Sequence, residues 1–123
     1  TLEAIHRRKT GAMFLVSLRL GGLCAGADSE QLAALDTYGK AIGLAFQIVD
    51  DLLDESGDEA AVGKRLNKDA GRGKLTFPRL LGVEESRRRA GVLVAEALAA
   101  LRPFGPAAEG LEALARYVLE RNR

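Results

Sequence analysis

Residues 43–54 of this 123-residue chain read GLAFQIVDDLLD, a run in which a few polar side chains interrupt an otherwise apolar sequence. At the 100° per residue of an α-helix, all the polar side chains of this run fall within an arc of about 100°, and apolar side chains fill the remaining circumference. The four polar residues are Gln47, Asp50, Asp51 and Asp54. The spacing therefore predicts an apolar helix with one stripe of carboxylates.

The helical spacing continues on both sides of this run. Asp28 followed by Gln31 is typical of a capped helix start, and Gly57 is expected to end the helix, so we predict one helix over about 28–56. Thr76 is a plausible cap for a later helix. The other predicted helices cover about 2–20 (ended by Gly21-Gly22), 76–82, 84–101 and 107–121. Without any strand-like alternation, the predicted fold class is all-α, a helical bundle in one domain over 1–123.

Composition narrows the classes of function. The chain has 18 basic and 17 acidic side chains and a net charge of +1, which argues against a nucleic-acid-binding protein that relies on bulk charge. A single cysteine excludes an internal disulfide framework and fits a reducing compartment, so we expect a cytoplasmic protein. No apolar run reaches the ~20 residues that a membrane span needs.

The sign of the charge changes just after the aspartate stripe. Residues 50–59 carry six acidic and no basic side chains, whereas residues 63–74 carry five basic and one acidic side chain. The segment 57–75 contains four glycines and is expected to be a charged, Gly-rich loop. Aspartates without His or Cys suit a hard cation such as Mg²⁺, and nearby basic groups would neutralise the remaining charge of a polyphosphate.

A solvated helix face is the alternative interpretation of the stripe, with the basic loop merely neutralising the acids. Two local conflicts count against it. Asp50 and Asp54 repel each other at i and i+4 with no basic residue three or four positions away, and they lie near the C-terminal end of their helix, where the macrodipole is already negative. On the first predicted helix, His6, Lys9 and Thr10 share a face on which a lysine and a hydroxyl could hold an anion, although this signal is weak by itself.

Three segments taken together resemble the trans-type polyprenyl diphosphate synthases, closest to the farnesyl diphosphate synthases of bacteria. They are HRRKTG at 6–11, GLAFQIVDDLLD at 43–54, and the span from GKR to GKLTFP at 63–78. The resemblance covers essentially the whole chain. It implies the C-terminal half of an isoprenoid-synthase-type helical fold and a Mg²⁺-dependent prenyltransferase. Such an enzyme condenses an allylic diphosphate (dimethylallyl or geranyl) with isopentenyl diphosphate to give farnesyl diphosphate, commonly as a homodimer.

The resemblance also implies a metal site. Asp50 and Asp54 correspond to the second aspartate-rich motif of the family, with Asp50 the direct Mg²⁺ ligand and a member of the catalytic set. Asp51 is implied as a supporting carboxylate of the same motif.

The substrate-binding residues are likewise implied by the resemblance. Lys9, Lys64 and Lys74 would bind the allylic diphosphate. Thr10 and Gln47 would also lie at the allylic substrate and stabilise the developing cation, so these two and Lys9 join the catalytic set.

The chain contains only part of the family's sequence pattern. It has one Asp-Asp-x-x-Asp sequence, at the second-motif position, and lacks the first aspartate-rich motif, the isopentenyl diphosphate site and the residues that limit product length. We therefore expect the C-terminal portion of a synthase, inactive by itself. Side chains such as Leu2, Leu15 and Leu32 are expected to be exposed where the other half would cover them, and Met13 is expected in the core.

Three alternatives remain open. Within the enzyme interpretation, the chain could belong to a geranylgeranyl or longer-chain diphosphate synthase. Outside it, the chain could be a non-catalytic helical module that binds a metal or an anion, or a structural dimerisation bundle with a solvated acidic stripe. Loss of Mg²⁺-dependent diphosphate binding on changing Asp50 to alanine would exclude the structural bundle.

Overall fold

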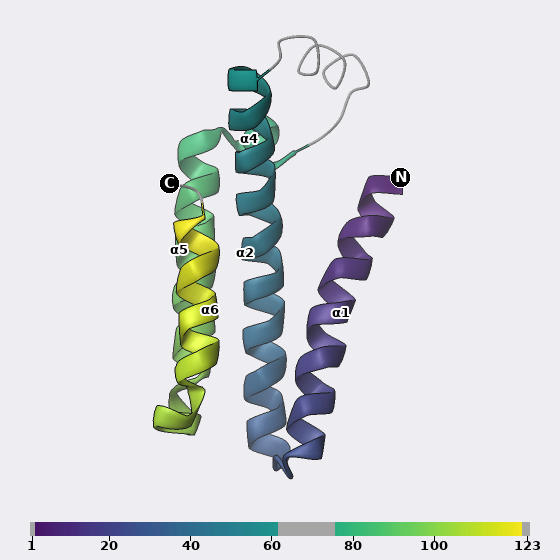
Figure 1. Ribbon diagram of the computed structural model, residues 1–123, viewed down its shortest axis with the longest axis vertical. Helices are drawn as coiled ribbons and strands as arrows, with labels where there is room; N and C mark the ends of the chain where they lie inside the picture. Colours follow the sequence, from purple (N-terminus) through teal and green to yellow (C-terminus); the bar gives the residue numbers. More distant parts are fainter. Residues whose placement is uncertain (1, 62–75, 122–123) are drawn as a thin grey trace.

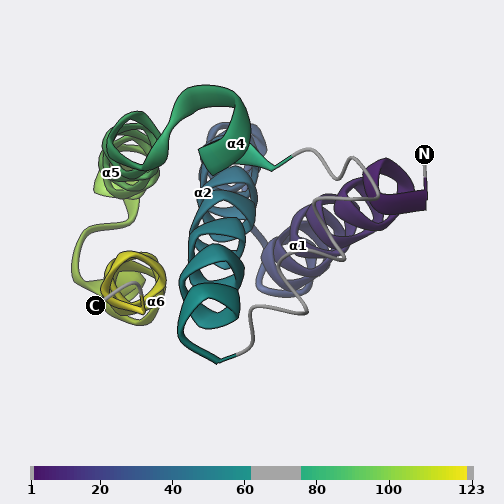
Figure 2. The same cartoon turned by 90° about the horizontal axis from the view of Figure 1, so that it is seen from above.

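The computed structural model describes residues 2–61 and 76–121, with side chains described over 9–54 and 76–121. Its elements are α1 (Leu2–Cys24), α2 (Ser29–Ala61), α4 (Phe77–Leu81), α5 (Val83–Ala100), the 3-10 helix η1 (Arg102–Ala108) and α6 (Glu109–Glu120). In these ranges every regular element is a helix. α2 stands in the middle of the bundle, with α1 on one side and α5 and α6 on the other (Figures 1 and 2). The predicted all-α bundle is confirmed.

The first helix is longer than predicted, because Gly21-Gly22 does not end it. α1 runs on to Cys24 and ends at Gly26, whose φ of 80° is the left-handed conformation of a Schellman cap. The Gly26 N–H donates to Leu23 O at 3.1 Å and the Ala27 N–H donates to Gly22 O at 2.8 Å. Gly22 stays helical because α2 packs tightly there: a Cβ at this position would lie 2.8 Å from Leu35 Cδ1.

The predicted cap of the central helix is confirmed, but its predicted end is wrong. Asp28 Oδ1 accepts from the Gln31 N–H at 2.8 Å, and the Asp28 N–H donates to Gln31 Oε1 at 3.0 Å, a reciprocal capping box. At the other end α2 continues through Gly57 to Ala61. A glycine inside a helix costs only about 1 kcal/mol relative to alanine, which a helix of this length can tolerate.

The remaining helices begin and end close to their predicted bounds. Thr76 caps α4 as predicted, since its Oγ1 accepts from the Arg79 N–H at 3.3 Å, and Pro78 lies in the first turn. Gly82, with φ of 86°, separates α4 from α5. The last predicted helix, 107–121, is a 3-10 turn followed by α6 from Glu109. None of the described helices is both long enough and apolar enough to cross a membrane.

The hydrophobic core lies between α2, α5 and α6. On α2 it is built from side chains at helical spacing that are almost completely buried, among them Ile42, Ile48 and Val49. Tyr38 belongs to the same layer and its hydroxyl donates to Leu111 O of α6 at 2.8 Å. Burial raises the pKa of Tyr38 to about 12. The core therefore fixes α2 against the C-terminal helices and leaves its other side to α1.

On that other side, two glycines of α2 let α1 approach closely. A Cβ at Gly39 would lie 2.9 Å from Leu18 Cδ1, and one at Gly43 would lie 3.8 Å from Gly11 Cα. Leu15 and Leu32, expected to be exposed, are instead partly buried at this contact. Leu2 lies outside the described side chains.

The opposite face of α1 is apolar and exposed. Met13 is 70% exposed, so its predicted place in the core is wrong. The error arises because helical spacing identifies an apolar face without telling what covers it. The other members of this exposed stripe, 55–57% exposed, are Val16, Leu20 and Leu23.

Candidate functional site

The aspartate stripe on α2 reaches three different environments. Asp50 is half-exposed, with 45% of its side chain accessible, whereas Asp51 is only 4% exposed and Asp54 is exposed. Within the part of the chain that the structure describes, no three carboxylate, histidine or cysteine side chains gather as a metal cage would require. The helix thus provides a row of carboxylates rather than a closed site.

Asp51 joins α2 to the beginning of α4. Its Oδ2 accepts from the Phe77 N–H at 3.1 Å, across 26 residues of sequence. The first N–H groups of a helix have no partner within the helix, so a buried carboxylate there satisfies a donor and complements the helix dipole. Asp51 therefore fixes the position of Phe77 beside the aspartate motif.

Asp50 lies beside the C-terminal end of α6. Arg121 Nη2 is 3.7 Å from Asp50 Oδ1, and the Arg121 guanidinium carbon is 4.7 Å from the centre of the Phe46 ring. The Phe46 ring also packs against the ring of Phe14 on α1; the two centroids are 5.7 Å apart and the ring planes are inclined by 58°. The middle of α1, α2 and the C-terminal end of α6 are thus linked through one aromatic ring and one carboxylate.

A pocket of about 320 Å³ lies between α1 and α2, where the glycines bring the two helices together. Gln47 of α2 lines it, as does Gly11, the residue after Thr10 on α1. Thr10 is partly buried and Lys9 is exposed. The full lining is Gly11, Leu15, Gly39, Lys40, Gly43, Leu44, Gln47 and Phe77. The structure therefore brings Gln47 and the neighbourhood of Thr10 to one cavity, one turn of α2 away from Asp50.

Two predicted residues, Lys64 and Lys74, lie outside the described residues. Two further cations, one in the α1–α2 pocket and one beside Asp50, were not selected from the sequence. Lys40 lines the α1–α2 pocket two turns before Gln47, so helical spacing could have indicated it. Arg121 comes close to Asp50 only through tertiary packing, and no local pattern points to it.

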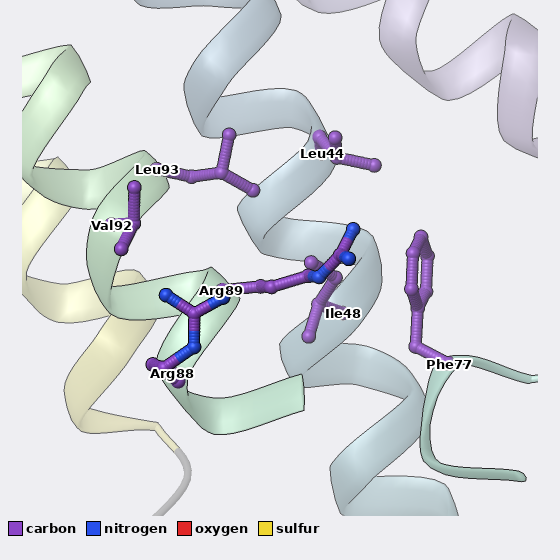
Figure 3. A pocket seen from close by; sticks show the side chains of 7 residues that line it. All are labelled: Leu44, Ile48, Phe77, Arg88, Arg89, Val92 and Leu93. Atoms are coloured by element: carbon purple, nitrogen blue, oxygen red, sulfur yellow. The ribbon is translucent and has the colours of Figure 1, made fainter. Parts of the chain in front are cut away.

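A second pocket, of about 250 Å³, lies on the α5 side of Phe77 (Figure 3). Phe77 and Leu44 line both pockets. In Figure 3, the Arg89 side chain extends from α5 towards Phe77. Phe77, held by Asp51, therefore separates the α1–α2 pocket, which Lys40 and Gln47 line, from a pocket that carries two arginines.

The arginines of this second pocket are held by one carboxylate. Glu85 accepts from Arg88 Nη2 at 2.6 Å and from Arg89 Nε at 3.2 Å. The hydrogen bond from Arg88, followed by that from Arg89, lowers the pKa of Glu85 to about 2, and the same contact raises the pKa of Arg88. At neutral pH this group of three side chains carries a net positive charge.

Comparison with known proteins shows which class this chain belongs to. A family model described as "Polyprenyl synthetase" matches residues 1–102, so the chain belongs to the polyprenyl synthetase family. It is 45% identical to the farnesyl diphosphate synthase of Escherichia coli over 99% of this chain and 42% of that protein. It is 42% identical to a chloroplastic geranylgeranyl pyrophosphate synthase of Catharanthus roseus, over 98% of this chain and 34% of that protein.

Solved structures agree with this assignment. The crystal structure of a putative farnesyl-diphosphate synthase from Marinomonas sp. MED121 superimposes with a TM-score of 0.75 at 37% identity, over 96% of this chain and 39% of that one. The predicted isoprenoid-synthase type of fold is thereby confirmed. The chain spans less than half the length of the relatives it matches.

Proposed function

We propose that this chain contributes the second aspartate-rich motif and part of the allylic diphosphate site to a Mg²⁺-dependent prenyltransferase. The reaction is the condensation of dimethylallyl or geranyl diphosphate with isopentenyl diphosphate to give farnesyl diphosphate. The observation that carries the proposal is the arrangement of Gln47 and Asp50 on successive turns of α2, beside the pocket that Gly11 lines after Thr10. Membership of the polyprenyl synthetase family supports the same reaction.

The carboxylates fit Mg²⁺ by their chemistry. Mg²⁺ is usually held by one or two carboxylates together with substrate phosphates and water rather than by a closed protein cage. Asp50 and Asp54 are exposed to solvent at a spacing of one turn and would hold the ion, whereas buried Asp51 would support the motif by holding Phe77 in place. When bound, Mg²⁺ stabilises the negative charge that builds on diphosphate as the allylic C–O bond breaks.

The chain's other residues would bind and shield the allylic substrate. The ammonium groups of Lys9, Lys64 and Lys74 would bind the diphosphate. The hydroxyl of Thr10 and the amide oxygen of Gln47 would direct dipoles at the carbocation, and the apolar lining of the α1–α2 pocket would exclude the water that quenches it.

The proposal also covers the length of the product, the cellular compartment and the oligomeric state of the whole enzyme. Relatives named as farnesyl and as geranylgeranyl synthases match over nearly all of this chain, so a geranylgeranyl or longer-chain product is the alternative. We place the reaction in the cytoplasm, in keeping with the single cysteine, and the whole enzyme in a homodimer, in keeping with the family.

Binding to the 123-residue chain tests the metal and diphosphate roles. Isothermal titration with geranyl diphosphate, with and without Mg²⁺, should show Mg²⁺-dependent binding that Asp50→Asn weakens by about tenfold or more. Asp36→Asn is the matched control, because Asp36 lies on the same helix and pairs with Arg19 at 2.6 Å. Equal binding by the wild type and Asp50→Asn would contradict the proposal.

A separate assay tests the expectation that the chain alone does not turn over. The purified chain incubated with Mg²⁺, geranyl diphosphate and isopentenyl diphosphate should give no prenyl product, because it contains only one of the family's two aspartate-rich motifs. Formation of farnesyl diphosphate in this assay would refute that expectation while leaving the assigned reaction standing.

A further inference from the structure

Arg121 is a side chain from a different helix that lies directly against Asp50, the principal carboxylate of the motif. It follows directly after α6, and the C-terminal end of α6 lies beside α2 in both views of the bundle (Figures 1 and 2). Its backbone N–H donates to Tyr117 O at 3.0 Å, so the last turn of α6 fixes the backbone from which the side chain extends. The guanidinium is thus aimed at Asp50 by the fold and not by its neighbours in sequence.

The guanidinium has a partner besides Asp50. It stands over the Phe46 ring at 4.7 Å, and that ring is itself packed against Phe14 at 5.7 Å. An arginine over an aromatic face is attracted by the ring quadrupole. The Arg121 side chain is only 22% exposed. The ring contact therefore helps to hold the guanidinium near Asp50.

The contact with Asp50 is loose. The Arg121 Nη2 to Asp50 Oδ1 distance of 3.7 Å exceeds the roughly 2.7–2.9 Å of a charge-assisted hydrogen bond. The carboxylate, with 45% of its side chain exposed, remains open to a cation from solvent. A cation that arrives there meets the fixed positive charge of Arg121 and must offset the existing ion pair.

From this geometry we propose that Arg121 is a counter-ion that competes with the divalent cation at Asp50 and so limits the metal affinity of the motif. The inference rests on the proposed function, because it takes Asp50 as a metal ligand. Arg121 acts through Asp50 and is a positioning residue: it holds the carboxylate when no cation is bound and yields it when one binds.

A pair of charge-matched variants tests the proposal. Arg121→Gln removes the counter-ion, and Arg116→Gln removes the same charge from the exposed side of α6. Because exposed ion pairs are weak, Arg121→Gln should tighten Mg²⁺ binding to the chain by about two- to fivefold in isothermal titration. Arg116→Gln should leave the dissociation constant within its error. Unchanged or weaker Mg²⁺ binding by Arg121→Gln would overturn the proposal.

The outcomes separate this inference from the proposed function. If the wild type binds Mg²⁺ and Asp50→Asn abolishes the binding while Arg121→Gln changes nothing, only the role of Arg121 fails. If the wild type binds no Mg²⁺, the metal role of Asp50 fails, and the role of Arg121 fails with it.

A measurement on the unaltered chain guards against a variant that does not fold. The Nε–Hε NMR signal of Arg121 should shift on addition of Mg²⁺ with the same apparent dissociation constant as the calorimetric titration, because release from Asp50 changes its environment. Arg121→Lys keeps the charge and should bind Mg²⁺ with an affinity close to that of the wild type. If the Nε–Hε chemical shift of Arg121 did not change at saturating Mg²⁺, the proposed competition between Arg121 and the cation would be wrong.

Discussion

The two sides of α2 are packed by different means. Towards α5 and α6 it buries large side chains such as Ile42 and Ile48 almost completely, whereas towards α1 it presents Gly39 and Gly43, which bring backbones together. The first side is a dry core, and the second encloses a pocket that Gln47 lines. Most of the buried packing therefore lies on one side of α2 and the pocket lined by Gln47 on the other, so substitutions on the two sides should differ in their effect on stability.

The largest effect is expected from a cavity in the core. Leu52 on α2 is 2% exposed, and Leu52→Ala should lower the free energy of unfolding by about 2–5 kcal/mol in urea denaturation. Leu20 on α1 is 57% exposed, so Leu20→Ala should change it by only about 0.5 kcal/mol or less. Similar losses for the two leucines would show that α1 is buried in solution and would break the contrast.

The next effect concerns the hydrogen bond that links α2 to α6. Tyr38→Phe removes the bond to Leu111 O and should cost about 0.5–1.5 kcal/mol of unfolding free energy. Because burial raises the pKa of Tyr38 from 10 to about 12, the unfolded chain loses this proton first as the pH rises. Stability of the wild type should therefore be intact below pH 10 and fall between pH 10 and 12. Thermal melts of Tyr38→Phe should lack this alkaline component; an identical decline in both proteins would argue against a buried phenol.

Substitution of glycines by alanine should change the unfolding free energy by a smaller amount, and in the stabilising direction. Gly91 lies inside α5 with no atom within 4 Å of a built Cβ, so Gly91→Ala should raise the unfolding free energy by about 0.5–1 kcal/mol. At Gly39 the same substitution would place its Cβ 2.9 Å from Leu18 Cδ1, and displacement of α1 side chains should remove much of that gain. Equal stabilisation at both positions, measured by chemical denaturation, would mean that the α1–α2 contact is not close.

The smallest effect is electrostatic and lies on the surface of α5. The pKa of Glu85 is lowered from 4.5 to about 2 by its arginine partners, so the folded chain holds this carboxylate ionised more firmly than the unfolded chain. The resulting stabilisation is present above pH 4.5 and is lost as the pH falls towards 2. Glu85→Gln should reduce the acid dependence of the melting temperature in that window. An unchanged acid profile would show that these exposed ion pairs contribute nothing measurable.

Local signals in the sequence predicted local structure well. The Asp28 and Gln31 capping box and the Thr76 cap depend on atoms three residues apart, which a single sequence contains. The wrong helix end at Gly21-Gly22 has the opposite cause, because it depends on how α2 packs against Gly22. A glycine marks either a helix end or a close approach, and only the partner helix decides between them.

The candidate site was predicted from the sequence only in part. The chemistry of the carboxylates was readable, and so was their place on one helix. The different environments of the carboxylates could not be predicted, because they depend on residues distant in sequence. Asp51 accepts a hydrogen bond from the Phe77 N–H, and Asp50 lies beside Arg121. A helical wheel shows the positions on one helix only, and residues of other helices decide which carboxylate is buried and which is exposed to solvent.

The position of Arg121 has a practical consequence for purification. A histidine tag fused after residue 123 would begin within about 11 Å of the Arg121 Cα, since a chain advances at most about 3.6 Å per residue. Its imidazoles could then reach the carboxylates of α2 and bind transition-metal ions together with them. Titrations of Mn²⁺ or Co²⁺ on this chain therefore call for an N-terminal or cleaved tag.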